Sequence, residues 1–295
     1  MFRFLSFILL LIFVLSCKNS SEEKHEIQLS EEFKNYWYSG EAEITSYKLE
    51  QARYGEIREG EAVLIYVTED FLPNAQVKAS EENDKNISVL KLNATKNFIT
   101  GIYPYSIMQS TFYPLNGEDY AFKVSASIQE WCGQVYMQLN NRDNFEITSH
   151  SYFQGEADEE FELEKFPLEN EIWNQLRIAH DKLPTGDFKM IASFEYLRLS
   201  HQPVKAYAVI GEYYAEGEFY VYKLSYPELR RELKIYYDKV FPYGIEKWEE
   251  SYPSGNPDTA EILTTRAVKK ERIKTDYWNK NSNKHLPLRD KLELN

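Results

Sequence analysis

The feature that most constrains the fold is an alternation of apolar and polar residues that recurs along most of the chain. Between residues 120 and 128, the apolar side chains of Tyr120, Phe122 and Val124 fall at every second position. A period of two places such side chains on one face of a β-strand. Strands are expected in this segment and at 62–68, 87–92, 145–153, 159–166, 188–198, 204–215, 218–226, 231–241, 244–252 and 260–270. The 23 Tyr, 17 Phe and 5 Trp also favour a β-rich body.

One segment has the spacing of a helix instead. Within 168–182, Ile172, Leu176 and Ala179 form an apolar stripe at intervals of three to four residues. Pro167 precedes the segment and a second proline follows it, as is typical of helix boundaries. The sequence therefore predicts a single helix near the middle of the chain.

Together these patterns predict a mainly β fold with one connecting helix. The helix, assigned to residues 167–184, joins two β-rich halves at 33–166 and 185–295. The sheet is expected to be antiparallel and strongly curved, either as an open half-barrel or as a sandwich of two packed sheets.

The N-terminus contains three features in a fixed order. Arg3 is followed by an apolar run at 4–15, which ends in the tetrapeptide Val14-Leu15-Ser16-Cys17. This arrangement resembles the lipobox of bacterial lipoproteins. The resemblance implies that residues 1–16 are a cleaved signal peptide and that Cys17 is acylated. The apolar run is too short to span a bilayer, which requires about 20 residues.

The resemblance implies a cell-envelope protein that is held on a membrane through its N-terminal lipid. Polar residues at 17–32 are expected to form a flexible tether, so the β-rich body would cover 33–295. Lys18 stands where some lipoproteins have an Asp that retains them in the inner membrane, so the outer membrane is expected. With Cys17 acylated, Cys132 has no partner for an intrachain disulfide.

The charge of the chain excludes one class of partner. The chain has 34 basic and 47 acidic residues, a formal net charge of −13. Cleavage after residue 16 removes Arg3, which leaves 33 against 47, or −14. Because nucleic acids are polyanions that require clustered Lys and Arg, we expect no nucleic-acid partner.

No local motif predicts catalysis. The sequence has no Gly-x-Ser-x-Gly turn, no glycine cluster that opens a helix, and no two histidines spaced i, i+4. His180 and Asp181 are interpreted as a charge pair near the negative end of the helix dipole. The sequence therefore predicts no catalytic residue, no metal site and no cofactor, and it leans against an enzyme.

The most unusual stretch of the body is 129–134. Apolar residues are even-numbered up to Ile128 and odd-numbered from Trp131, so the apolar face changes side here. Such a change requires either a β-bulge in one long strand or a hairpin. In one interpretation the strand is kinked, with Trp131 in the core and Cys132 buried and inert.

A second interpretation gives the same stretch a binding role. If the kink directs side chains into a groove, Glu130 and Gln134 would orient a ligand and Trp131 would form its apolar wall. Glu130, Trp131 and Gln134 are therefore the candidate ligand-binding residues.

Three segments carry a family resemblance over most of the chain: Tyr36-Trp37-Tyr38, Gln129-Glu130-Trp131-Cys132-Gly133 and Tyr236-Tyr237-Asp238-Lys239-Val240-Phe241-Pro242. They resemble a group of lipoproteins from Bacteroidetes-type bacteria that are often labelled "septum formation inhibitor Maf". That label implies a nucleotide pyrophosphatase, a family similar to cytoplasmic α/β proteins with a Ser-Pro-Arg-Arg loop. The chain has no such loop. The resemblance therefore implies the label without the activity.

Three functions remain open from the sequence. The first is a non-enzymatic binding or assembly protein whose curved sheet holds an apolar small molecule or docks another envelope protein, which predicts an aromatic-lined groove. The second is an envelope hydrolase, which predicts two carboxylates about 5–10 Å apart in a cleft. The third is a purely structural lipoprotein, which predicts a filled interior. The first is favoured.

Overall fold

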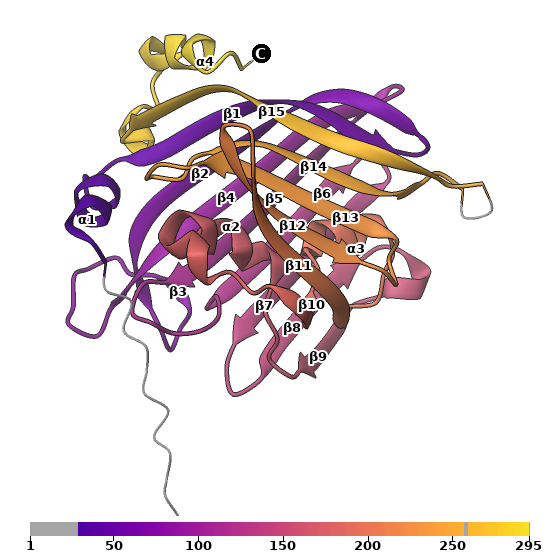
Figure 1. Ribbon diagram of the computed structural model, residues 1–295, viewed down its shortest axis with the longest axis horizontal. Helices are drawn as coiled ribbons and strands as arrows, with labels where there is room; N and C mark the ends of the chain where they lie inside the picture. The colour runs from indigo at the N-terminus through magenta and orange to yellow at the C-terminus, as the bar shows by residue number, and fades with distance from the viewer. Residues whose placement is uncertain (1–28, 257–258, 295) are drawn as a thin grey trace, which may run out of the picture.

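The computed structural model describes residues 29–256 and 259–294, in which 15 strands join into one antiparallel sheet (Figure 1). The first half of the chain contributes β1 (Ala42–Arg53), β2 (Glu56–Leu72), β3 (Val77–Lys78), β4 (Ile87–Thr100), β5 (Tyr103–Pro114), β6 (Lys123–Glu130), β7 (Gly133–Asn141), β8 (Phe145–Ser151) and β9 (Glu159–Leu163). The second half contributes β10 (Gly186–Ile191), β11 (Ala206–Glu216), β12 (Phe219–Tyr226), β13 (Arg231–Asp238), β14 (Ile245–Ser254) and β15 (Glu261–Thr275).

The two halves of the chain meet at the pairing of β15 with β1. Their register runs from Ala42 opposite Thr275 to Glu50 opposite Arg266. Within each half, the strands lie side by side in sequence order, apart from the short β3, which pairs with β2. Strands β9 and β10 are consecutive in the chain but form the two opposite edges of the open sheet. Among the described residues, 55% lie in strands and 16% in helices. The prediction of a mainly β, antiparallel fold is confirmed, and a single curved sheet replaces the alternative of two packed sheets.

The predicted helix is present and lies inside the curve of the sheet. Helix α2 covers Glu169–Ala179, and a short 3-10 turn, η2 (His180–Lys182), continues it. It contacts both halves of the sheet: the Asn174 amide donates to the Leu90 carbonyl on β4 at 2.8 Å, and Trp173 packs against Trp248 on β14. The connecting helix thereby fills the space that the sheet encloses (Figure 1).

The prediction of one strand over 188–198 is wrong in its second half. Strand β10 ends at Ile191, and a second helix, α3 (Phe194–Leu199), follows. Ser193 caps this helix because its hydroxyl accepts a hydrogen bond from the Tyr196 amide. Both faces of this short helix are largely buried, so it has no polar stripe by which alternation could have distinguished it from a strand.

The change of apolar face at 129–134 is produced by a hairpin, and the prediction of a kink within one long strand is wrong. Glu130 at the end of β6 pairs with Gly133 at the start of β7, which leaves Trp131 and Cys132 as the two-residue turn. Trp131 is 69% exposed and Cys132 is exposed, so neither is the buried core residue that the kinked strand required.

Three strands, β1, β5 and the two-residue β3, were not among those predicted by alternation. On β1 both faces are buried, including the polar residues Glu43, Thr45 and Gln51, so the strand has no polar face to reveal its period. The C-terminal segment covers its outer face. Leu292 packs against Ala42 and neighbouring apolar residues, and the Ser46 hydroxyl donates to the Leu292 carbonyl at 2.5 Å.

The remaining helices are short and lie at the periphery: α1 (Glu31–Trp37), α4 (Pro287–Lys291), η1 (Gln154–Glu156), η3 (Tyr277–Asn279) and η4 (Asn283–His285). Helix α1 begins within the last residues assigned to the tether, with Ser30 as its cap. Across the described ranges, no helix combines the length and the apolar character needed to cross a membrane. Cys17 and the predicted signal peptide lie outside the described residues.

Candidate functional site

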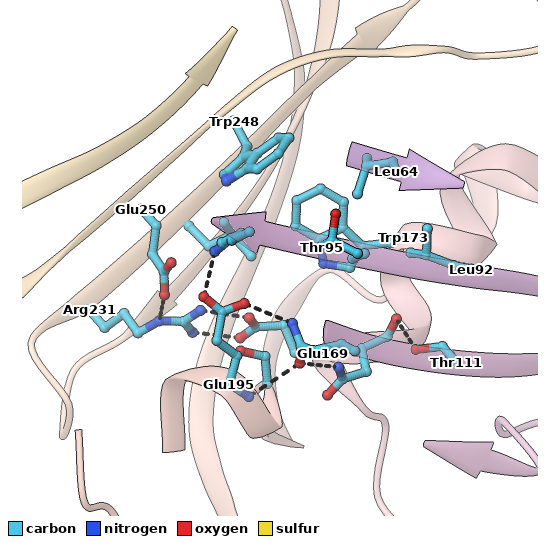
Figure 2. A pocket seen from close by; sticks show the side chains of 16 residues that line it. Leu64, Leu92, Thr95, Thr111, Glu169, Trp173, Glu195, Arg231, Trp248 and Glu250 are labelled. Atoms are coloured by element: carbon cyan, nitrogen blue, oxygen red, sulfur yellow. Dashed lines mark hydrogen bonds and ion pairs between the residues drawn. The ribbon is translucent and has the colours of Figure 1, made fainter. Parts of the chain in front are cut away.

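A small polar cavity lies between the connecting helix and the sheet (Figure 2). Its volume is about 50 Å³, which is room for only a few water molecules. Trp173 from α2 and Trp248 from β14 form an apolar wall, and five charged side chains contribute the polar lining: Lys96, Glu169, Glu195, Arg231 and Glu250. The enclosed space is too small for a typical organic ligand, for which pockets of about 300–1,000 Å³ are usual.

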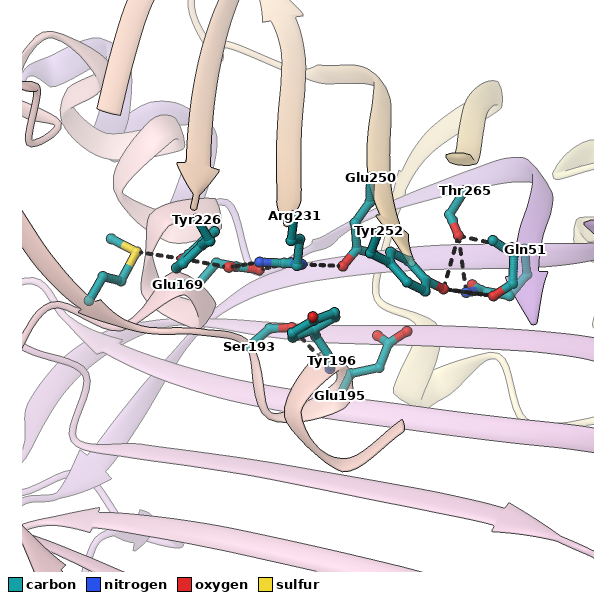
Figure 3. A network of polar contacts seen from close by, with 12 residues as sticks. Gln51, Glu169, Ser193, Glu195, Tyr196, Tyr226, Arg231, Glu250, Tyr252 and Thr265 are labelled. Atoms are coloured by element: carbon teal, nitrogen blue, oxygen red, sulfur yellow. Dashed lines mark hydrogen bonds and ion pairs between the residues drawn. The ribbon is translucent and has the colours of Figure 1, made fainter. Parts of the chain in front are cut away.

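Arg231 is the centre of the charged groups around this cavity (Figure 3). Its two terminal nitrogens donate to the Glu169 carboxylate at 2.5 and 2.6 Å, and its Nε donates to Glu250 at 2.7 Å. The Tyr226 hydroxyl donates to the same Glu169 carboxylate at 2.7 Å. Burial opposes ionisation of Glu250, but Arg231 and Lys96 outweigh it and hold the pKa of this carboxyl below its usual range.

A second buried pair completes the charge balance. The Lys96 ammonium donates to Glu195 at 2.7 Å, and the Gln109 amide donates to the other Glu195 oxygen at 2.9 Å. Two cations thus face three carboxylates. Burial is the main reason that the pKa of Glu195 is raised, and the nearby Glu250 adds to it. Burial therefore shifts the pKa of Glu195 upward, whereas Arg231 and Lys96 shift that of Glu250 downward.

The hydrolase interpretation requires a pair of carboxylates available to a substrate. The carboxylates of Glu169, Glu195 and Glu250 all accept hydrogen bonds from side chains of the cluster. The described residues also contain no group of three or more His, Cys, Asp or Glu side chains that could hold a metal ion. The geometry of this cavity is that of an ion network which joins α2, α3 and both halves of the sheet.

A much larger space, the terminal groove, opens at one end of the curved sheet. It has a volume of about 680 Å³, within the usual range for ligand pockets. The ends of β1, β6, β8 and β14, the turn between β12 and β13, and the end of α3 meet there. Its lining includes Arg53, Tyr54, Glu130, Cys132, Tyr152, Phe153, Tyr196, Leu199, His201, Leu229, Arg230 and Tyr252.

Two tyrosines form the floor of the terminal groove and separate it from the buried ion network. Tyr196 and Tyr252 pack edge to face with ring centroids 5.7 Å apart, and both are buried. On its inner side, Tyr196 contacts the guanidinium of Arg231, which lies 4.3 Å from the ring centroid. The Tyr252 hydroxyl donates to the Ala52 carbonyl at 2.6 Å and accepts from Gln51 (Figure 3). These contacts make the floor rigid.

The wall beside the end of α3 is held by a small charge cluster. Arg198 and His201 both contact the Glu156 carboxylate of η1, and the distance from His201 Nδ1 to Glu156 Oε1 is 2.6 Å. The Phe153 ring packs edge to face against His201 at 4.9 Å. This cluster fixes the segment after β8 against the end of α3, so the aromatic wall keeps its position.

The structure separates the three candidate ligand-binding residues. Glu130 lines the terminal groove, and its carboxylate accepts from the Cys132 amide at 2.7 Å and from the Tyr152 hydroxyl at 3.4 Å. Trp131 extends from the hairpin turn, with its ring 6.4 Å from that of Tyr103, and is not among the residues that line the groove. Gln134 is an exposed residue of β7 outside the groove lining.

The other residues of the groove carry no local signal in the sequence. Arg53, Tyr152, Tyr196 and Tyr252 come from four segments separated by at least 40 residues, and each resembles an ordinary residue at a strand or helix end. Only the change of apolar face at 129–134 pointed to this region. It found Glu130 because the hairpin turn forms part of the groove wall.

Comparison with known proteins gives no family for the chain. No family model matches it, and no curated protein matches it. A solved structure of a porin-like protein from Bacteroides uniformis is similar with a TM-score of 0.22 and 10% sequence identity, over 77% of this chain and 95% of that chain. A likeness of this size carries no argument about fold or function.

Proposed function

We propose that this chain is a lipid-anchored protein of the cell envelope that binds a small ligand in the terminal groove without catalysing a reaction on it. The observation that carries the binding role is the groove itself, a space of about 680 Å³ with a rigid aromatic floor. Small-molecule sites typically combine an apolar, concave surface with a few fixed polar groups. The terminal groove has this composition, whereas the internal cavity is small and its charges are paired.

The anchoring part of the proposal is supported by the N-terminal sequence. Arg3, the apolar run at 4–15 and Cys17 occur in the order and spacing of a lipobox. Acylation at Cys17 would hold the body at a membrane surface, and the preference for the outer membrane follows from Lys18. The ligand would then be a molecule of the envelope.

A groove-filling variant tests the binding role. Ser200 lines the terminal groove at the end of α3, so Ser200→Trp should fill part of the space. The probe is N-phenyl-1-naphthylamine, a neutral apolar dye that becomes fluorescent in apolar sites. We expect saturable binding by the wild-type chain and a loss of about tenfold or more in affinity for the variant.

The matched control is Ser106→Trp, which adds the same side chain at an exposed position of β5 outside the groove lining. This variant should bind the dye like the wild type. Equal binding by Ser200→Trp and the control, with both variants folded by circular dichroism, would show that the dye binds elsewhere and would contradict the proposed site.

A further inference from the structure

Arg53, at the edge of the terminal groove, is a half-buried cation without a carboxylate partner. Its Nη1 donates to the Leu199 carbonyl at 2.7 Å, and its Nη2 donates to the hydroxyls of Tyr54 and Tyr105, each at 3.2 Å. Its guanidinium lies 4.2 Å from the centroid of the Tyr54 ring. Within residues 29–256 and 259–294 no ion pair involves Arg53, and its Nε has no hydrogen-bond partner.

The buried arginines of the described chain, in contrast, each pair with a carboxylate. Arg177 pairs with Glu43, Arg198 with Glu156, and Arg231 with Glu169 and Glu250. Such pairing is the general rule, because a guanidinium stays charged in proteins and an uncompensated charge away from water is costly. Arg53 departs from this rule at the wall of the terminal groove, where a bound molecule could supply the missing negative charge.

The other charges of the groove favour the same sign of ligand. Arg230 is exposed in the turn between β12 and β13 and makes no side-chain hydrogen bond or ion pair with a described residue. Glu130 is the acidic residue of the lining, and both of its oxygens already accept hydrogen bonds from Cys132 and Tyr152. The groove therefore has an excess of positive charge in a chain whose formal net charge is −13.

Much of the remaining lining is apolar, beside polar side chains such as Ser200 and Gln202. Tyr196 and Tyr252 form the floor, and Phe153, Leu199 and Leu229 add aromatic and aliphatic surface. These groups offer no charge to a polar ligand, but they can bury an alkyl or aromatic portion at about 25 cal/mol per Å² of apolar surface.

We propose that the terminal groove binds an amphiphile with one anionic head group and an apolar tail, and that Arg53 is the counter-charge of the head group. This inference rests on the proposed binding function. Arg230 assists at the mouth of the groove, and the tail lies against the tyrosine floor. A charged head group would supply the counter-charge that no described carboxylate gives Arg53.

The test compares two fluorescent probes that differ in one charge, cis-parinaric acid and its methyl ester. Wild-type protein should bind the acid about tenfold more tightly than the ester. Arg53→Met should remove this preference by weakening the acid and leaving the ester unchanged, whereas Arg53→Lys should retain part of it. Arg230→Met should also weaken the acid. Because Arg230 has no partner to lose, this second variant remains informative if Arg53→Met does not fold.

Each outcome separates the inference from the function on which it rests. Equal binding of acid and ester, unaffected by Arg53→Met and Arg230→Met, would overturn the role of Arg53. Binding of N-phenyl-1-naphthylamine without binding of either parinaric probe would overturn the amphiphile as ligand class. In both cases the groove would remain a binding site. If the wild-type protein binds none of the three probes, the proposed function is overturned as well.

Discussion

Arg231 on β13 and Glu169 on α2 form two hydrogen bonds, of 2.5 and 2.6 Å, that fasten the connecting helix to the second half of the sheet. Both side chains are buried, at 3% and 1% exposure. A buried ion pair stabilises the fold little more than apolar side chains of similar size would. Removal of one partner, however, leaves a buried charge without its counter-charge, which is strongly destabilising. The pair therefore makes the position of α2 sensitive to single substitutions.

Replacement of Glu169 should consequently be far more damaging than replacement of Glu195. Glu169→Gln removes the carboxylate that accepts from both terminal nitrogens of Arg231 and should lower the free energy of unfolding by about 3–5 kcal/mol. Glu195→Gln should cost less, because burial already disfavours the ionised form of Glu195 in the folded chain, as the raised pKa of this carboxyl shows. Denaturant unfolding of the two variants measures the difference. Equal losses would contradict this difference between the two carboxyl groups.

Glu171 should make the stability of the fold depend on pH. Burial raises the pKa of this carboxyl to about 8 from 4.5, although the amides of Ala121 and Leu168 donate to it. Between these two values the folded chain holds a proton that the unfolded chain has lost. The stabilising proton is fully present at low pH and is lost as the pH rises. This group should thus lower the unfolding free energy by up to about 1.4 kcal/mol per pH unit across that range.

The variant Glu171→Gln isolates this contribution. Its amide cannot ionise, so the unfolding free energy of the variant should change less between pH 5 and pH 8 than that of the wild type. At pH 5 the variant should be less stable, because its amide nitrogen cannot accept from one of the two backbone donors. Parallel pH profiles for the two proteins would show that another group is responsible.

Tryptophan substitutions test the hairpin at 129–134. Trp131 is 69% exposed, so Trp131→Ala should change the unfolding free energy by about 0.5 kcal/mol or less. Trp248 is buried between Tyr47 and Trp173, and Trp248→Ala should cost about 3–5 kcal/mol. Chemical denaturation measures both changes. A large loss of unfolding free energy for Trp131→Ala would show that Trp131 is a core residue.

Alternation predicted most strands because one face of the sheet packs on the core and the other meets solvent. On β6, Val124, Ala126 and Ile128 are buried while the intervening residues are not. Alternation failed on β1 and α3, where both sides of the segment are covered, on β1 by the C-terminal segment and on α3 by its neighbours. It also missed β5, although buried and exposed residues alternate at 105–108. Periodicity in a sequence reports a difference in solvation, so it disappears where that difference is small.

Less of the candidate site than of the fold could be predicted from the sequence. Glu130 was found because the hairpin changes the parity of apolar residues. Arg53 and Tyr252 meet only because β15 pairs with β1 and brings the two halves of the chain together. The partners of a charged side chain are also a tertiary property. Nothing in the sequence distinguishes Arg53, which lacks a carboxylate, from Arg231, which has two.

Lipid attachment is a prediction about the N-terminus alone. If Cys17 is the acylated residue, Cys17→Ser should accumulate as a longer precursor without incorporation of labelled palmitate, since no thiol remains for the modification. Metabolic labelling followed by electrophoresis measures both effects. Cys132→Ser is the matched control and should be labelled and processed like the wild type. Equal labelling of Cys17→Ser would refute the lipobox.

Gly133 allows the hairpin to support the groove wall. A Cβ at this position would lie 2.3 Å from the ring of Tyr152, which lines the terminal groove, so Gly133→Ala should displace that ring. We expect weaker binding of N-phenyl-1-naphthylamine, by about threefold to tenfold, in a protein that remains folded. Gly155→Ala is the control, because its Cβ would meet no atom within 4 Å. Unchanged binding by Gly133→Ala would exclude Tyr152 from the binding surface and would restrict the ligand to the side of the groove formed by Arg53, Tyr196 and Tyr252.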